Sequence, residues 1–171
     1  MKQLTITKTG ARILELNISG KAEKFTPRES RKWGKVADKI LTAIEDYDQP
    51  VQDLIDEAQE ISLTDIDMDE RMTEERRLNR DIRELEDTIG KEEITMVLET
   101  DEFAIINDAW WTMKFSADRK TRALTSAISD SIEGAIEVTI EEGQVVPVDK
   151  SAPKPRQNHR KNTNLRQMSR V

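Results

Sequence analysis

Residues 26–47 read TPRESRKWGKVADKILTAIEDY and contain the strongest local signal in the chain. Thr26 is placed to cap a helix, Pro27 suits the first helical position, and Glu29 completes a capping box. Behind this start, apolar side chains recur at spacings of three and four residues for four turns: Trp33, Val36, Ala37, Ile40, Leu41, Ile44 and Tyr47. The stretch therefore predicts a long amphipathic helix with one buried face.

The pattern on the C-terminal side of this helix leaves two alternatives open. Pro50 cannot continue an ideal helix because its ring clashes with the preceding turn. The apolar residues Val51, Leu54, Ile55 and Ala58 nonetheless keep nearly the same phase, so a kinked helix and two consecutive helices both fit. Residues 62–69 are predicted to form a polar connection, and residues 70–89 a charged helix that Gly90 is placed to end.

Alternation of polar and apolar residues predicts strands on both sides of this helical centre. An N-terminal β-hairpin is indicated by Leu4 and Ile6, then Leu14, Leu16 and Ile18, with strands at 3–7 and 11–18. Residues 93–99 are predicted as a third strand, and the alternating Ile136, Val138 and Ile140 as a fourth. Gly143 and Pro147 are expected to end regular structure.

Two further helices are predicted between the third and fourth strands. The first begins at Thr100 or Asp101 and has one apolar face, formed by Phe103, Ile106, Ala109, Trp110 and Met113. The second begins near Ser116, ends near Gly134 and turns its apolar residues towards the core: Leu124, Ala127, Ile128 and Ile132. The predicted fold class is therefore α+β, with an N-terminal β-hairpin, four to five helices, two further strands and a disordered basic C-terminal tail.

The net charge of −7 hides an uneven distribution along the 171 residues. Residues 1–148, the predicted folded domain, contain 20 bases and 33 acids, a net charge of −13. Residues 149–171 contain one acid and seven bases, a net charge of +6, and almost no large apolar side chain. Because such a segment cannot offset its ordering entropy by burial, we expect it to be a flexible tail.

The cations of this tail are the first group of predicted partner-binding residues. They suit phosphate backbones or an acidic protein surface, and the alternative is a solubilising terminus without a partner. The seven residues are Lys150, Lys154, Arg156, Arg160, Lys161, Arg166 and Arg170.

The adjacent Trp110 and Trp111 point about 100° apart on a helix, so both cannot be centred on one buried face. We expect Trp111 either at the edge of the core or in contact with a partner, where tryptophan often carries binding energy. Four arginines, Arg76, Arg77, Arg80 and Arg83, are interleaved with acids. We expect ion pairs to neutralise them, so they do not predict a nucleic-acid surface.

Residues suited to catalysis or metal binding are scarce. The chain has no cysteine, and its one histidine, His159, lies in the predicted tail, where nothing would hold it in a catalytic geometry. Residues 65–69 resemble the opening of a calcium loop, but Glu70 and Arg76 stand where that loop needs a glycine and a bidentate glutamate. We therefore predict no enzymatic activity, no cofactor and no metal, with an undetected carboxylate hydrolase as a third possibility behind two binding roles.

No signal peptide and no apolar window of about 18 residues is found in the sequence, so we expect a soluble intracellular protein. Residues 20–22 (GKA) followed by 29–35 (ESRKWGK) and an amphipathic helix resemble the opening of small uncharacterised late-gene proteins of tailed bacteriophages. The later order of a charged helix, a strand and a further helix is also similar, and the resemblance covers about a third of the chain.

This resemblance implies a virion component or assembly factor, located in the virion or the host cytoplasm, and it supplies no catalytic residue. The leading hypothesis is a structural or assembly protein. Its body would bind neighbouring protein subunits, and its tail an acidic surface or DNA. The alternative is a regulatory or counter-defence binder whose acidic body mimics nucleic acid.

Overall fold

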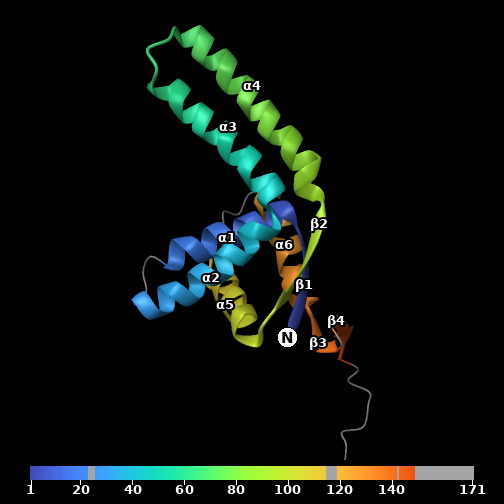
Figure 1. The fold of residues 1–171 in the computed structure, drawn as a ribbon. Coiled ribbons are helices and arrows are strands. Elements are labelled where there is room, and N and C mark those ends of the chain that lie inside the picture. The colour runs from blue at the N-terminus through green and yellow to red at the C-terminus, as the bar shows by residue number, and fades with distance from the viewer. Residues whose placement is uncertain (23–25, 115–118, 142, 149–171) are drawn as a thin grey trace, which may run out of the picture.

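The computed structural model describes residues 1–22, 26–114, 119–141 and 143–148. These residues form six α-helices, one short 3₁₀ turn and four strands (Figure 1). In chain order the elements are β1 (Lys2–Thr7), α1 (Lys8–Ala22), α2 (Pro27–Ala43), α3 (Glu45–Leu63), α4 (Met68–Asp87), η1 (Ile89–Lys91), β2 (Glu93–Leu98), α5 (Thr100–Trp111), α6 (Arg119–Glu133), β3 (Ile136–Glu141) and β4 (Gln144–Pro147). The predicted α+β class is confirmed. The predicted tail, 149–171, lies outside the described residues.

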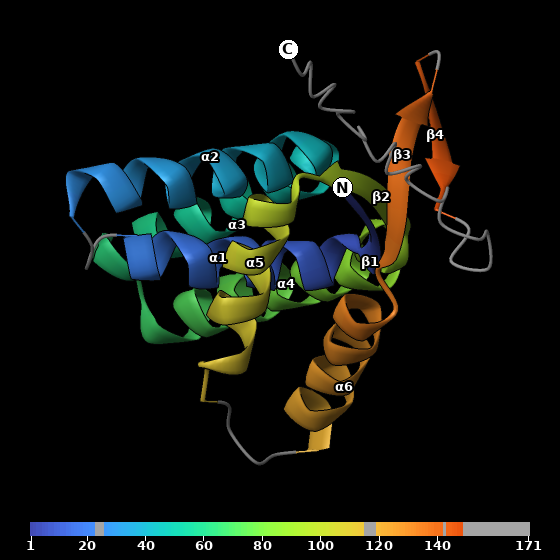
Figure 2. The same ribbon diagram turned by 90° about the horizontal axis from the view of Figure 1, so that it is seen from below.

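The four strands form one antiparallel sheet in the order β2-β1-β3-β4. In the β1–β2 pair, Leu4 lies opposite Met96 and Ile6 opposite Ile94, and these side chains face the core because directly opposed residues share one face of a sheet. Helices α1, α2, α5 and α6 supply the rest of that core. Figure 2 shows β3 and β4 at one edge of the molecule, beyond the helices.

The predicted N-terminal hairpin is wrong, because residues 11–18 belong to helix α1 and only β1 is a strand. The buried residues Ala11, Leu14 and Ile18 follow helical spacing, whereas Leu16 is 53% exposed. The hydroxyl of Thr7 accepts a 3.2 Å hydrogen bond from the Gly10 N–H and so satisfies an amide at the start of the helix. The spacing of Leu14 and Ile18 is thus that of one helical face, and Leu16 between them lies on the exposed side of the helix.

The predicted capping box is confirmed at the start of α2. The Glu29 carboxylate accepts hydrogen bonds from the Thr26 N–H at 3.3 Å and from the Thr26 hydroxyl at 2.6 Å. Of the two alternatives at Pro50, consecutive helices are correct, but the break lies at Ile44. Pro50 sits inside α3, in its second turn, where its missing N–H removes one backbone hydrogen bond.

Two later helices begin and end at residues other than those predicted. Helix α4 ends at Asp87, and Gly90 does not cap it but lies buried in η1. Helix α5 is capped by Glu99, which forms a capping box with Glu102, instead of by Thr100 or Asp101. Residue Ser116, the predicted start of the next helix, lies outside the described residues.

The C-terminal strand β4 was missed in the sequence. Gly143 has φ of 82°, a conformation that glycine adopts at little cost, and it lets the chain turn back so that β4 pairs with β3. Regular structure therefore continues to Pro147. Of the three apolar residues predicted for β3, Val138 is buried, whereas Ile136 and Ile140 are exposed.

Helices α3 and α4 leave the body together as an antiparallel helical hairpin (Figure 1). We call residues 45–87 the arm. Its base is packed tightly against the start of α1, where the Thr9 hydroxyl donates a 3.2 Å hydrogen bond to the hydroxyl of the buried Tyr47. A Cβ atom on Gly90 would lie 3.1 Å from the Tyr47 ring and would collide with the Thr9 hydroxyl. The base of the arm therefore has no room for a side chain at residue 90.

Gly90→Ala is expected to lower the free energy of unfolding by about 1–3 kcal/mol, because the added methyl group must displace Thr9 or Tyr47. Gly34→Ala is the matched control, since no atom lies within 4 Å of a Cβ at that position of α2. It should be neutral or raise stability by up to about 1 kcal/mol, because glycine is costly inside a helix. Urea titrations followed by circular dichroism measure both changes, and equal stabilities for the two variants would contradict the close packing.

Candidate protein-binding arm

The arm is held to the body by ion pairs around the first turn of α1. The Lys8 ammonium lies 2.5 Å from an oxygen of Asp46 and 2.6 Å from an oxygen of Glu92. Lys8 is only 6% exposed, and hydrogen bonds to Asp46 and Glu92 raise its pKa. One turn further, Arg12 lies 2.6 Å from Asp48. These contacts fix the direction in which α3 leaves the body.

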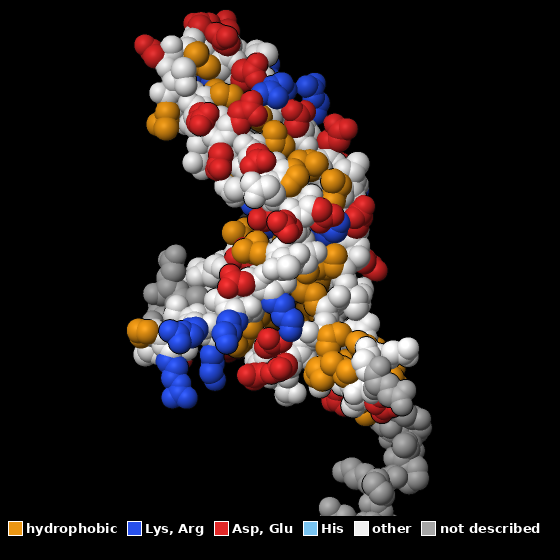
Figure 3. All heavy atoms as spheres, in the orientation of Figure 1, with side chains coloured by type: hydrophobic (Ala, Val, Ile, Leu, Met, Phe, Trp, Pro, Cys, Tyr) orange, Lys and Arg blue, Asp and Glu red, His pale blue; other side chains and the backbone are white. Residues whose placement is uncertain are grey.

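The arm carries the largest share of the negative charge of residues 1–148. Residues 45–87 include 17 acids and five bases, a net charge of −12. Residues 1–44 are positive, at +6, and residues 88–148 are at −7. Helix α3 has seven acids and no lysine or arginine, and Figure 3 shows the red acidic side chains spread along the arm. Positive and negative charge are therefore separated on the surface of the folded protein as well as along the sequence.

A groove of about 520 Å³ runs between α3 and α4 near the base of the arm. Its apolar lining comes from Pro50, Leu54 and Leu85. Acidic side chains surround this lining from both helices: Asp53, Glu57, Asp81 and Glu84. An apolar floor with an acidic rim is complementary to an amphipathic segment that carries basic residues.

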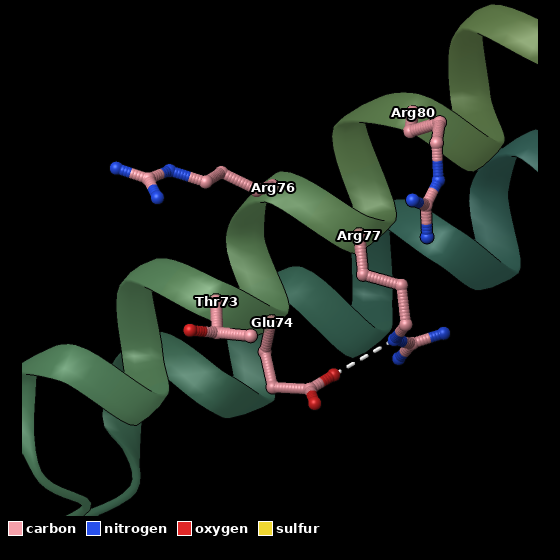
Figure 4. Close-up of a pocket in the computed structure, with 5 residues that line it drawn as sticks. All are labelled: Thr73, Glu74, Arg76, Arg77 and Arg80. Carbon is pink, nitrogen blue, oxygen red and sulfur yellow. Dashed lines mark hydrogen bonds and ion pairs between the residues drawn. The ribbon is translucent and has the colours of Figure 1, made fainter.

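The outer half of the arm is held together by Arg77. Its guanidinium bonds to Glu57 across the two helices, to Glu74 at 2.8 Å and to Asp81 at 3.4 Å. Figure 4 shows Arg77 directed towards Glu74, while Arg76 points away from the helix. Arg80 lies 3.8 Å from Asp81. The expected neutralisation is thus confirmed for Arg77 and Arg80, but no ion pair joins Arg76 or Arg83 to another described residue. Arg77 is the member of this group that links α4 to α3.

The tip of the arm exposes large apolar side chains. Leu63 is 87% exposed and Met68 is 74% exposed, on either side of the turn that joins the two helices. Asp67 caps α4 by accepting a 3.3 Å hydrogen bond from the Asp69 N–H. In the described part of the chain, no cluster of three or more acidic or histidine side chains is arranged to hold a metal ion.

The structure places one of the predicted partner-binding residues. Trp110 is buried and its indole N–H donates to Ser129 at 3.0 Å, whereas Trp111 is 52% exposed and its indole N–H donates to Asn107 at 2.9 Å. Trp111 lies on α5, in the body and not on the arm. The seven tail cations and His159 fall outside the described residues, so their predicted contacts stay predictions.

Sequence reasoning missed a row of cations on α2. Arg28, Lys32 and Lys35 recur at spacings of four and three residues, and Arg31 lies beside them. All four are exposed, and Figure 3 shows blue side chains gathered over this helix. The signal was present in the sequence, but summing the charge over residues 1–148 concealed it beneath the acids of the arm.

Comparison with protein-family models, with curated proteins and with solved structures found no significant match to this chain. None of the helices in the described segments combines the length and the apolar content that crossing a membrane requires.

Lys8→Met should lower the free energy of unfolding by about 1.5–3 kcal/mol, because it removes hydrogen bonds to two charged groups and keeps the apolar stem. Lys91→Met is the control, since that exposed lysine pairs with Asp87 on the surface at 2.8 Å. Its loss should cost less than about 0.5 kcal/mol. Similar losses for both variants in urea titrations would show that Lys8 is not a special anchor.

The contribution of Lys8 should depend on alkaline pH. Since folding raises its pKa from 10.5, the stabilisation is complete below pH 10.5 and is lost as the pH rises through the folded pKa. The stability difference between the wild-type protein and Lys8→Met should therefore be constant from pH 7 to about pH 10 and shrink above it. A difference that stayed constant to pH 12 would contradict the ion pairing.

Proposed function

We propose that the chain is a non-enzymatic assembly protein that binds a basic segment of a neighbouring protein subunit through the arm. The observation that carries this proposal is the groove between α3 and α4, whose apolar floor is surrounded by Asp53, Glu57, Asp81 and Glu84. It lies on an arm that projects from the body and has a net charge of −12.

Two physical effects would act together in such a site. The concentrated negative charge attracts a basic partner over a distance of about one Debye length and speeds encounter. Burial of apolar side chains against Leu54 and Leu85 then supplies affinity that charge alone does not give, because exposed ion pairs contribute only about 0.2–1 kcal/mol each. An amphipathic helix with lysine or arginine beside its apolar face satisfies both requirements.

The setting we propose is the virion or the assembly pathway of a tailed bacteriophage, in the particle or the host cytoplasm. Supporting it are the resemblance of residues 20–22 and 29–35 to late-gene proteins and the opposite charges of the folded part and of residues 149–171. In this setting the cations from Lys150 to Arg170 contact an acidic protein surface or packaged DNA.

A second candidate is a regulatory or counter-defence binder that mimics nucleic acid. The acids of α3, which has no lysine or arginine, favour it because they give one edge of the arm a continuous negative charge. The five arginines of α4 count against it, since a phosphate backbone has no cations. Displacement of duplex DNA from a host enzyme by the wild-type chain, and not by arm variants, would favour this candidate.

The groove is tested with a labelled 18-residue peptide of leucine and lysine in amphipathic helical order, and with a scrambled peptide of the same composition. Fluorescence anisotropy should show tighter binding of the amphipathic peptide. Leu54→Ala should weaken that binding about five- to thirtyfold, because about 1–2 kcal/mol of apolar contact is lost, and should leave the scrambled peptide unaffected. Leu63→Ala, at the exposed tip, is the control.

Charge at the groove rim is tested with Glu84→Lys, and Asp130→Lys on α6 provides the same change of charge away from the arm. The rim variant should bind the amphipathic peptide about three- to tenfold more weakly and show a smaller dependence on salt. Equal affinity for the two peptides, or equal effects of the two charge changes, would reject the groove as the binding site.

The role of the tail is tested by ending the chain at Val148. Circular dichroism should show that the shortened chain stays folded, because the core is formed by residues before this point. Native mass spectrometry of complexes recovered from producing cells should show that the shortened chain is lost from the larger assembly. Incorporation equal to that of the full chain would reject the proposed contacts of the tail cations.

A further inference from the structure

A row of three cations on α2 is the most prominent charged surface that the arm does not include. Arg28, Lys32 and Lys35 are exposed on one side of the helix, and no hydrogen bond or ion pair joins them to other described residues. The next cation in this row, Lys39, is different, because it pairs with Glu102 at 2.7 Å. We call Arg28, Lys32 and Lys35 the α2 row.

The acids beside the α2 row limit what can bind to it. A cleft of about 330 Å³ is lined by Lys32 and Lys35 together with the α5 residues Glu99, Asp101 and Glu102. Burial would raise the pKa of Glu102, but hydrogen bonds from Lys39 and from the Glu99 N–H lower it overall. A nucleic-acid backbone laid along the row would bring phosphates close to these carboxylates, so the surface favours separate carboxylates of a protein partner over a phosphate backbone.

The outer edge of α3 carries a matching row of acids. Asp53, Asp56 and Glu60 are exposed and lie at spacings of three and four residues, so they share one side of α3, where Asp53 also borders the groove. The side-chain contacts of Asp53 and Asp56 are hydrogen bonds from the neutral Gln49 and Gln52, each 2.8 Å long. We call Asp53, Asp56 and Glu60 the α3 row.

The two rows have the same length, and the gaps between their residues occur in reverse order. The α2 row has gaps of four and then three residues, the α3 row has gaps of three and then four, and both span about 10 Å along their helices. Two helices laid side by side in antiparallel orientation would therefore place Arg28 opposite Glu60, Lys32 opposite Asp56 and Lys35 opposite Asp53. No parallel arrangement aligns all three pairs.

The partner helices must come from different molecules. Within one chain, α3 begins directly after α2 and the break at Ile44 turns the arm away from the body (Figure 1). The α3 row of a chain therefore cannot lie along its own α2 row.

We propose that the arm of one copy docks on α2 of the next copy, with the α3 row paired against the α2 row. This inference rests on the proposed function, because it takes the arm as the binding element and names a second copy as a partner. The two surfaces differ, so the association is head-to-tail and continues into rings or filaments instead of stopping at a symmetric dimer. Three exposed ion pairs give a weak contact that high salt dissociates.

The head-to-tail contact is tested with two charge-reversed variants, one with Lys32→Glu and Lys35→Glu and the other with Asp56→Lys and Glu60→Lys, neither of which lines the groove. Sedimentation velocity at low salt should show wild-type assemblies larger than a dimer that dissociate at 0.5 M salt. Each variant alone should be monomeric. An equimolar mixture should stop at a heterodimer. The intact α3 row of one variant pairs with the intact α2 row of the other, whereas the two altered rows would bring like charges together at two of their three positions.

Disulfide trapping detects the same contact when it is short-lived, since the chain has no cysteine of its own. Lys32→Cys and Asp56→Cys chains, mixed under mild oxidation at low salt, should form a mixed disulfide at least tenfold faster than Lys32→Cys mixed with Arg80→Cys. Arg80 is the control because it lies on the opposite helix of the arm. Circular dichroism of every variant verifies the fold, and Lys32→Gln with Lys35→Gln replaces any charge-reversed chain that fails to fold.

Several outcomes would overturn the proposal. A wild-type chain that stays monomeric at low salt and about 1 mM, with no preference in disulfide trapping, excludes the contact. A mixture of reversed variants that remains monomeric excludes the pairing of these rows. If the wild-type chain binds duplex DNA and the α2 variant does not, the α2 row binds phosphates and not a second copy of the chain. If self-association fails while the leucine–lysine peptide still binds the groove, the second copy is rejected and the proposed function stands.

Discussion

The arrangement of the molecule depends on one buried ammonium group. Lys8 bonds to Asp46 at the start of the arm and to Glu92 just beyond its end, so a single cation fixes both ends of the arm against the β1–α1 junction. A buried charge must be paired because desolvation without a partner costs several kcal/mol. Any tilt of the arm would separate Lys8 from one of its two acids, and this requirement restrains the direction of α3 and α4.

The same junction keeps opposite charges of one chain apart. Helix α2 carries an exposed row of cations and α3 an exposed row of acids, and only Ile44 separates the two helices in sequence. If the chain continued as one helix past Ile44, both rows would lie along that helix. Because the helix breaks at Ile44, the acids instead lie on the arm, which projects away from α2. The cations of α2 therefore do not neutralise the acids of α3 within the chain, and both remain exposed for other molecules.

Local signals in the sequence predicted the parts of the fold that depend on local contacts. The capping box at Thr26, the buried face of α2 and the strand at 93–98 are confirmed, because caps and periodicity are set by neighbouring residues. The prediction for residues 11–18 was wrong because a separation of four residues, as between Leu14 and Ile18, fits a strand and a helix equally well. The hydroxyl of Thr7 accepts a hydrogen bond from the Gly10 N–H and so favours the start of a helix. The sequence did not predict that α3 and α4 form a projecting hairpin. The periodicity of two successive helices shows that each has an apolar face, but not whether that face packs against the core or against the other helix.

The arm has few internal contacts, and this bears on how it can bind. Leu78 is the one fully buried residue among the described residues of α4, and much of the remaining cohesion comes from Arg77 and its surface carboxylates. Exposed ion pairs contribute little free energy, so the outer arm is less stable locally than the base, where Tyr47 and Val51 are buried. A partner that covers Leu54 and Leu85 would add apolar contacts that the hairpin does not make alone. Binding would therefore stabilise the arm by mass action, and the open groove is where that stabilisation would arise.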